Sequence, residues 1–388
     1  TPSPPAPSAG ATLPTPTTSP TLLPSPAPSS LAGGYRSWTR IDLPDPASAQ
    51  DFGASVTGLV AFHGSYIATG SVLRGGNASL NRGVVWTSAD GRTWTVHDRI
   101  AAFDGAALRG LVTDGSRLVA FGNHAGEPAR ATWVSLDGTD WTRSIGVAPS
   151  VVVAGPHGFI GAVTTAGPDA EGSNGLSGAS VRFVQSADGL HWTGSSTTFA
   201  AYVGFAGSLA RSLAVTRSGH ALAVGETGTA ASVEAVLLRS EDGRTWTGPA
   251  RLATDAMPIA VGASGDGFLV AAWSQVWRVS PAGEAQPVAF PIEEGENVTG
   301  FFVVGDVVIA LGLGPIEGGR PQAQVWLSTD GGASFDRITG QAAFGSDLPT
   351  SWFGAVVATP GGLLAVGSWD DPASVRGGFR PAAWLASR

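Results

Sequence analysis

The basic residues restrict the chemistry that this chain can perform. All 22 cationic side chains among the 388 residues are Arg, and neither Lys nor Cys occurs. This excludes Schiff-base and thiol nucleophiles, a Walker-type phosphate loop, disulfides and Cys-ligated zinc. Any nucleophile or acid–base group has to be Ser, Thr, Tyr, His or a carboxylate, and no H-E-x-x-H or G-x-S-x-G segment arranges such groups. The net charge of −8 argues against a nucleic-acid partner. We expect no cofactor and no metal.

Two arginines are candidates for ligand binding. Arg109 and Arg211 each precede a repeated apolar segment by two residues, so their guanidinium groups could clamp a carboxylate or a phosphate together. Ion pairs with carboxylates of neighbouring segments are the alternative. A cluster of Glu293, Glu294 and Glu296 could hold Ca²⁺, although solvated loop charge is the default interpretation.

Three tryptophans are the other candidates. Ten of the 13 Trp fit positions of an internal repeat, whereas Trp273, Trp352 and Trp369 do not. Aromatic side chains outside the repeat could form a stacking platform for sugar rings or a hot spot for a protein partner. Packing between repeats is the alternative.

The repeat itself contains five similar turns. Four read S-x-D-G-x-x-W-T, and the fifth has one more residue before its aromatic. We call these segments the repeat turns. A degenerate sixth copy, from Val276, has Ala282 in place of Asp. The Asp accepts backbone N–H bonds, the Gly adopts a positive φ and the aromatic packs under the hairpin, so the motif is structural. Its residues are Ser88, Asp90, Trp94, Ser135, Asp137, Trp141, Ser186, Asp188, Trp192, Ser240, Asp242, Trp246, Ser328, Asp330 and Phe335.

The repeat turns resemble Asp boxes, and the chain is similar to the Asp-box (BNR, sialidase-like) β-propellers. Apolar hairpins precede the turns seven times, beginning at Leu59, Leu111, Val152, Leu213, Ala260, Phe301 and Ala355. The resemblance and this count predict an all-β, seven-bladed propeller over residues 35–388. The segment from Trp38 to Ile41 is expected to supply the outer strand of the last blade and so close the ring.

Antiparallel turns alternate between the two ends of a blade, so the repeat turns should share one face of the propeller. The long variable loops should then lie on the opposite face, where we expect any binding site. Sialidase-like relatives keep their pocket there.

Sialidase activity would need an Arg trio, a Tyr nucleophile activated by Glu, and an acid–base Asp. Tyr202 is the one Tyr expected on the face of the variable loops, and Glu226 is the nearby carboxylate. The arginine motif of the family is missing, because Thr39-Arg40-Ile41-Asp42-Leu43-Pro44 lacks its aromatic and misplaces its Pro. We therefore expect a non-catalytic propeller that binds a protein partner or a surface glycan. A sialidase-like glycoside hydrolase is the alternative, and a structural or assembly-factor role in a surface complex is a second one.

The N-terminal composition indicates a tether. Residues 1–34 carry ten Pro, twelve Ser or Thr and no charge, so they are expected to be disordered. Met257 is the only Met, which indicates that an upstream segment was removed. A Pro/Ser/Thr stalk at this place resembles the start of a mature bacterial lipoprotein, and a plain secreted protein is the alternative. We expect an extracytoplasmic protein of a GC-rich bacterium, without a transmembrane segment and with a lipid anchor upstream of residue 1 or none.

Overall fold

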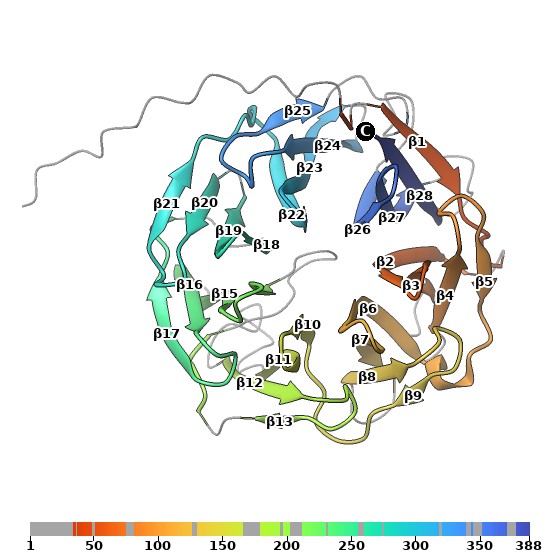
Figure 1. Ribbon diagram of the computed structural model, residues 1–388, viewed down its shortest axis with the longest axis horizontal. Coiled ribbons are helices and arrows are strands. Elements are labelled where there is room, and N and C mark those ends of the chain that lie inside the picture. Colours follow the sequence, from red (N-terminus) through yellow and green to blue (C-terminus); the bar gives the residue numbers. More distant parts are fainter. Residues whose placement is uncertain are drawn as a thin grey trace, which may run out of the picture.

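The structure is a computed structural model in which strands surround a central opening (Figure 1). It describes residues 34–35, 37–48, 51–74, 81–125, 130–165, 179–194, 197–201, 212–229, 232–254, 260–273, 275–317, 320–338, 343, 351–370 and 378–388. Apart from the short 3-10 helix η2(Ala101–Phe103), the regular structure in these ranges is β. No helix in the described part of the chain has the length and apolar character needed to cross a membrane.

Five separate sheets each contain four antiparallel strands that follow one another in the chain. Figure 1 shows that the first strand of each sheet lies at the central opening and the fourth at the rim. The sheets are β6(Ala106–Thr113), β7(Leu118–His124), β8(Arg130–Ser135), β9(Thr142–Arg143); β10(Val151–Gly155), β11(Gly158–Thr165), β12(Ser180–Ser186), β13(Thr193–Gly194); β14(Leu213–Val215), β15(Ala221–Thr229), β16(Ser232–Ser240), β17(Trp246–Arg251); β18(Ala260–Ser264), β19(Gly267–Ala272), β20(Gln275–Val279), β21(Ala285–Val288); and β22(Asn297–Val304), β23(Val307–Glu317), β24(Arg320–Ser328), β25(Asp336–Ile338).

The remaining eight strands form one continuous sheet. The prediction of seven separate blades is therefore wrong, because the structure has five four-stranded blades and one eight-stranded sheet. That sheet contains β2(Gly53–Phe62), β3(Ser65–Leu73), β4(Arg82–Ser88), β5(Thr95–His97), β26(Ser351–Thr359), β27(Gly362–Asp370), β28(Phe379–Ser387) and β1(Ser37–Asp42).

A glycine allows the two halves of this sheet to join. Gly53 in β2 pairs in parallel with Phe379 in β28. Gly53 has a φ of 139°, and a Cβ on it would overlap the backbone of Phe379. A residue with a side chain at this position would therefore keep β2 and β28 apart. The five four-stranded sheets are not paired with one another in this way.

The N-terminal strand completes this sheet on the outside, as predicted for the closure. β1 pairs antiparallel with β28 in a register that runs from Ser37 opposite Ser387 to Asp42 opposite Ala382. Trp38 is buried against Phe353, with ring centroids 6.4 Å apart. The first and last described segments of the propeller are thereby held together by hydrogen bonds.

Buried tryptophans of the third strands anchor the links that lead into their own sheets. The indole N–H of Trp86 donates to the carbonyl of Pro44 at 2.9 Å, and that of Trp133 donates to Ala102 at 2.7 Å. Trp326 and Trp384 make the same kind of bond to Pro291 and Ala343. Because all four side chains are fully buried, these bonds fix the path of each link over the indole that it contacts.

The repeat turns have the local geometry that the sequence predicts. In the first one, Asp90 accepts backbone N–H bonds from Arg92 at 2.8 Å and Thr93 at 2.7 Å. The hydroxyl of Ser88 donates to Asp90, and the indole of Trp94 donates to the carbonyl of Gly91. The other Ser–Asp pairs of the motif repeat the hydroxyl bond. The degenerate copy also forms a hairpin, between β20 and β21.

These bonds make the repeat turns sensitive to acid. Backbone N–H donors lower the pKa of Asp90, Asp137 and Asp242 below the ordinary value. The folded-state pKa then lies below the unfolded value of about 3.9, so the stabilisation is complete at neutral pH. It is lost as the pH falls through the folded pKa.

We expect Asp137→Asn to lower the melting temperature at pH 7 by about 1–2 °C. The difference should shrink at pH 3, because this pH lies below the unfolded pKa of about 3.9 and the unfolded chain then binds the proton. Thermal melts followed by circular dichroism from pH 7 to pH 3 measure this effect. A difference that stays constant over the whole range would show that the charge of Asp137 is unimportant.

Candidate functional site

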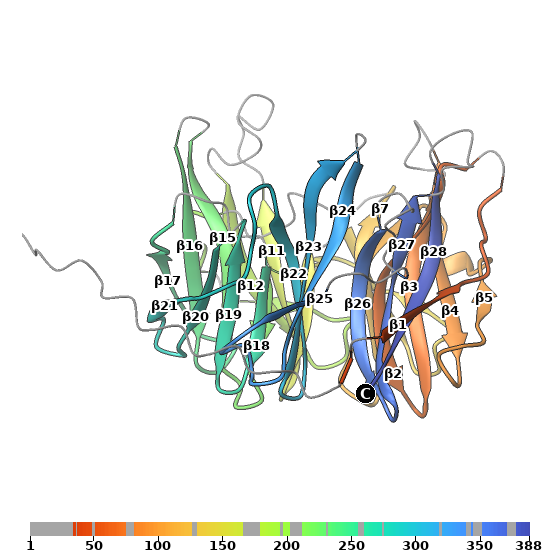
Figure 2. The same ribbon diagram turned by 90° about the horizontal axis from the view of Figure 1, so that it is seen from above.

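The two ends of the propeller differ in their loops. One end, the turn face, carries the repeat turns and the hairpin turns between the first and second strands. The other end, the loop face, carries the connections from the second to the third strand. Figure 2 shows the ends of β15, β16, β23 and β24 rising on the loop face, with the C-terminus on the opposite side. This arrangement agrees with the alternation expected for antiparallel strands.

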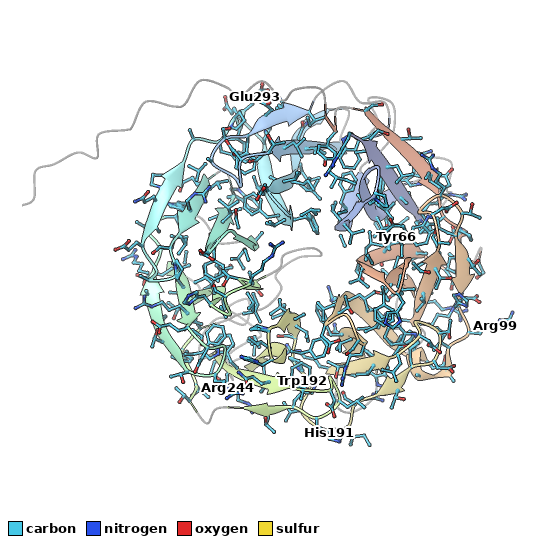
Figure 3. All side chains as sticks on the ribbon, viewed as in Figure 1. Tyr66, Arg99, His191, Trp192, Arg244 and Glu293 are labelled. Carbon is cyan, nitrogen blue, oxygen red and sulfur yellow. The ribbon has the colours of Figure 1, made fainter. Side chains whose placement is uncertain are left out.

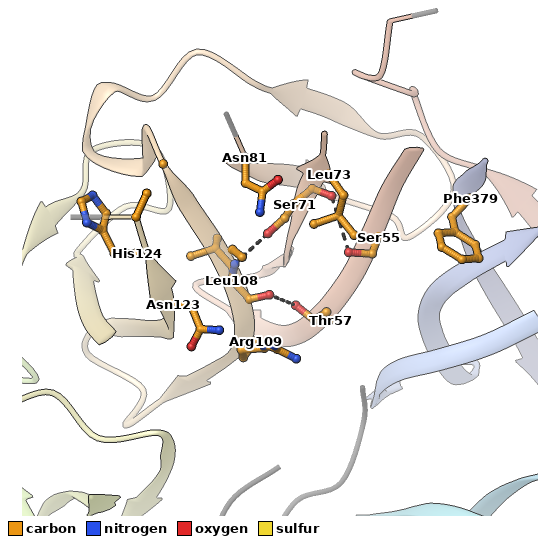
Figure 4. Close-up of a pocket in the computed structure, with 13 residues that line it drawn as sticks. Ser55, Thr57, Ser71, Leu73, Asn81, Leu108, Arg109, Asn123, His124 and Phe379 are labelled. Atoms are coloured by element: carbon orange, nitrogen blue, oxygen red, sulfur yellow. Dashed lines mark hydrogen bonds between the residues drawn. The ribbon is translucent and has the colours of Figure 1, made fainter. Parts of the chain in front are cut away.

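The loop face has a cavity of about 410 Å³ between β2–β3 and β6–β7. This volume lies within the range of small-ligand sites and fits one or two side chains. The close-up in Figure 4 shows the strands that form it. It is lined by Ser55, Thr57, Ser71, Leu73, Asn81, Gly105, Ala107, Leu108, Arg109, Asn123, His124, Ala125 and Phe379.

The hydroxyl groups of this cavity hold its walls together. Thr57 Oγ1 donates to the carbonyl of Leu108 at 3.0 Å, and the amide of Leu108 donates to Ser71 Oγ at 2.7 Å. Both bonds join the eight-stranded sheet to the β6–β9 blade. Most of the described lining residues therefore lie on strands that are hydrogen-bonded to one another, which favours a fixed shape.

The side chains at the mouth of the cavity include hydrogen-bond donors. Arg109 is exposed at the mouth, as is the amide of Asn123. Asn81 uses its Oδ1 to accept the Arg74 amide at 3.0 Å, which leaves its NH₂ group as a donor. None of the described lining residues is Asp or Glu. The donor groups among these described residues suit an acceptor such as a carboxylate or a peptide carbonyl.

One predicted aromatic is exposed and one is buried. Trp273 is 55% exposed beyond the end of β19. Trp369 in β27 is 8% exposed, and the guanidinium of Arg40 lies 4.4 Å from its ring centroid. This cation–π contact joins β27 to β1, so the position of Trp369 favours packing over ligand binding. Trp352 lies in β26 opposite Ser368, and its side chain is outside the described residues.

Of the predicted catalytic pair, the structure describes Glu226 but not Tyr202. Glu226 in β15 is 7% exposed, and burial raises the pKa of its carboxyl above the ordinary value. Within the described part of the chain, the carboxyl group of Glu226 has no hydrogen-bond or ion-pair partner. Tyr202 and Arg211 lie outside the described residues, so the structure does not place them against Glu226 or Arg109.

The acidic cluster is an ion-pair network. Arg337 pairs with Glu293 at 2.7 Å, and its other terminal nitrogen pairs with Glu296, which is buried. Glu296 also accepts the amide of Glu293 at 2.8 Å. Figure 3 shows Glu293 at the outer rim of the ring. Across the described ranges, no group of three His, Asp or Glu could hold a metal ion.

Two features were missed by the sequence reasoning. The first is the amide pair of Asn81 and Asn123 in the loop-face cavity. Gly70-Ser71 in β3 and Gly122-Asn123 in β7 occupy corresponding positions of the repeat. The replacement of Ser by Asn at this position could have been noticed in the sequence. The second is a cavity of about 580 Å³ around the axis on the turn face, walled mainly by apolar side chains of the first strands, including Phe301 and Phe302. Arg217, Asp266 and Asp306 lie on its rim.

Comparison with solved structures supports the β-propeller fold. No protein-family model matches the sequence, and no curated protein matches it. A structure of YCF48 bound to D1 peptide aligns with 93% of this chain and 97% of its own, at 14% identity and a TM-score of 0.55. A GH74 xyloglucanase from Xanthomonas campestris aligns with 89% of this chain and 55% of its own, at 16% identity and a TM-score of 0.54. A Trypanosoma rangeli sialidase aligns with 89% of this chain and 59% of its own, at 12% identity and a TM-score of only 0.45. At these identities the similarities show the fold alone.

Proposed function

We propose that this protein is a non-catalytic, extracytoplasmic propeller of the Asp-box type that binds a protein partner through its loop face. The observation that carries this proposal is the loop-face cavity, with the exposed side chains of Arg109 and Asn123 at its mouth. Donor groups around an apolar pocket recognise a peptide segment through its carbonyl or carboxylate oxygens and one inserted side chain.

The similarity to a peptide-bound propeller supports a protein partner. YCF48 carries D1 peptide on a scaffold that aligns along almost the whole of both chains. A scaffold of this shape can therefore hold a peptide. The residues that do so here have to be tested directly, since the identity of 14% carries over no contact.

The chain enters the propeller at the turn face. The amide of Tyr35 donates to the carbonyl of Ser387 at 2.9 Å, next to the C-terminal end of β28. If residues 1–34 tether the propeller to a cell surface, the loop face points away from the attachment. This orientation supports a partner that approaches from outside.

A glycoside hydrolase is the second candidate, because a buried carboxyl with a raised pKa is what a general acid requires. Glu226 has both properties. Hydrolysis of sialosides or xyloglucan oligosaccharides that disappears in Glu226→Gln and Tyr202→Phe would favour this candidate over the first.

The test of the proposed function is selection of a phage-displayed library of random 12-residue peptides on the full chain. We expect enriched peptides whose affinity drops about tenfold or more in Arg109→Glu, because the charge reversal repels the acceptor groups of the peptide. Fluorescence anisotropy of labelled peptides measures the affinity. Asp266→Ala on the turn face is the matched control and should bind like the parent.

Two results would contradict the proposal. One is a library that yields no enriched peptide. The other is a set of peptides whose affinity changes in Asp266→Ala and is unaffected by Arg109→Glu, which would place the binding site at the turn-face cavity.

A further inference from the structure

The turn that follows β19 is tight. Ala272 at the end of β19 pairs with Gln275 at the start of β20, so only two residues connect the strands. Trp273, the first of them, has a φ of 55°. Two-residue hairpins favour Asn, Asp or Gly at positions with positive φ, and a bulky aromatic there is strained.

The backbone of Trp273 replaces a hydroxyl that other sheets use. The amide of Val56 donates to Ser368 Oγ at 3.1 Å, just as the Leu108 amide donates to Ser71 Oγ. At the corresponding junction, the amide of Val298 donates to the carbonyl of Trp273 at 2.9 Å. The contact between neighbouring sheets is thus made by a main-chain atom, and the fold does not need the indole for it.

The indole is instead displayed to solvent. Among the tryptophans whose side chains the structure describes, Trp273 alone is exposed. Gly or Asn would suit its backbone conformation better and would preserve its carbonyl bond. A strained residue whose side chain contributes little to the core points to a function for that side chain.

We propose that Trp273 is an aromatic anchor of the loop face that stacks on a proline, aromatic or arginine side chain of the protein partner. This proposal rests on the proposed function and adds a second contact point. Figure 1 shows β19 across the central opening from β3 and β7, whose ends form the loop-face cavity. A partner that contacts both places has to span the opening, which a protein does and a single sugar ring does not. Trp offers a large rigid contact at a low entropic cost.

The test compares stability and binding in the same variants. Trp273→Gly should raise the melting temperature by about 1–3 °C, because glycine relieves the positive φ. It should also lower the affinity for the selected 12-residue peptides about tenfold or more, as the loss of an aromatic hot spot does. Trp273→Phe should keep most of the affinity. The control is His63→Gly on the turn face, where His63 has a φ of 48°, and it should leave the affinity unchanged.

Each outcome decides the proposal. Parent-like affinity in Trp273→Gly, with affinity lost in Arg109→Glu, would overturn the anchor while the proposed function stands. A melting temperature that falls by several degrees in Trp273→Gly would show that the indole serves the fold, which also overturns it. If the library yields no peptide, the proposed function fails. Saturable quenching of parent fluorescence by sialosides or xyloglucan oligosaccharides, lost in Trp273→Gly, would then assign the indole to glycans and overturn the protein anchor.

Discussion

A chain that begins at Leu43 should melt roughly 5–10 °C below a chain that begins at Gly34, because it lacks the outer strand β1. Six residues of β1 pair with β28, and removing them leaves β28 as an open edge. The deletion also removes the buried side chains of Tyr35 and Trp38. Differential scanning calorimetry of the two chains measures the loss.

A point variant separates the two contributions of β1. Trp38→Ala keeps the backbone pairing and removes the contact with Phe353, so its melting temperature should lie between those of the two chains. The chain without β1 should also aggregate sooner on heating, since an unpaired strand edge recruits other chains. Equal melting temperatures for the chains beginning at Gly34 and Leu43 would show that β1 does not close the ring.

Local features of the fold were predictable because they depend on neighbours in sequence. The repeat turns close through bonds within a few residues, as in Asp90 with Arg92 and Thr93, so spacing alone identifies them. The pairing of β1 with β28 was predictable for a related reason, since the repeat pattern shows a blade divided between the two ends of the chain.

Features that depend on contacts between sheets were not predictable. The parallel pairing of Gly53 with Phe379 joins residues more than 300 positions apart, and it turned two expected blades into one sheet. The loop-face cavity likewise arises where two sheets meet. The spacing of Asn81 and Asn123 in the sequence therefore did not indicate that they line one cavity. Arg109 was identified because it stands at a repeat position, and Trp273 because it departs from one.

Gly70→Ala should destabilise the protein by about 3 kcal/mol or more, because a Cβ at this position would overlap the carbonyl of Ser55. Gly122 and Gly312 meet the opposite backbone in the same way, each across from an irregularity in the first strand of its sheet. The overlap is with main chain, so side-chain movement cannot relieve it. Gly361→Ala is the matched control, since nothing lies within 4 Å of its added Cβ. It should be neutral or slightly stabilising.

The same substitution tests whether the walls of the loop-face cavity are rigid. Ser55 and Ser71 line the cavity on either side of the contact that Gly70 permits, and Ser71 accepts the amide of Leu108. Forcing β2 away from β3 should therefore lower both the affinity for the selected peptides and the stability of the fold. Urea denaturation gives the free energy of unfolding, and anisotropy gives the affinity under native conditions. A Gly70→Ala variant with the stability and affinity of the parent would mean that the two strands separate without cost, and a cavity with such walls could not select its ligand by shape.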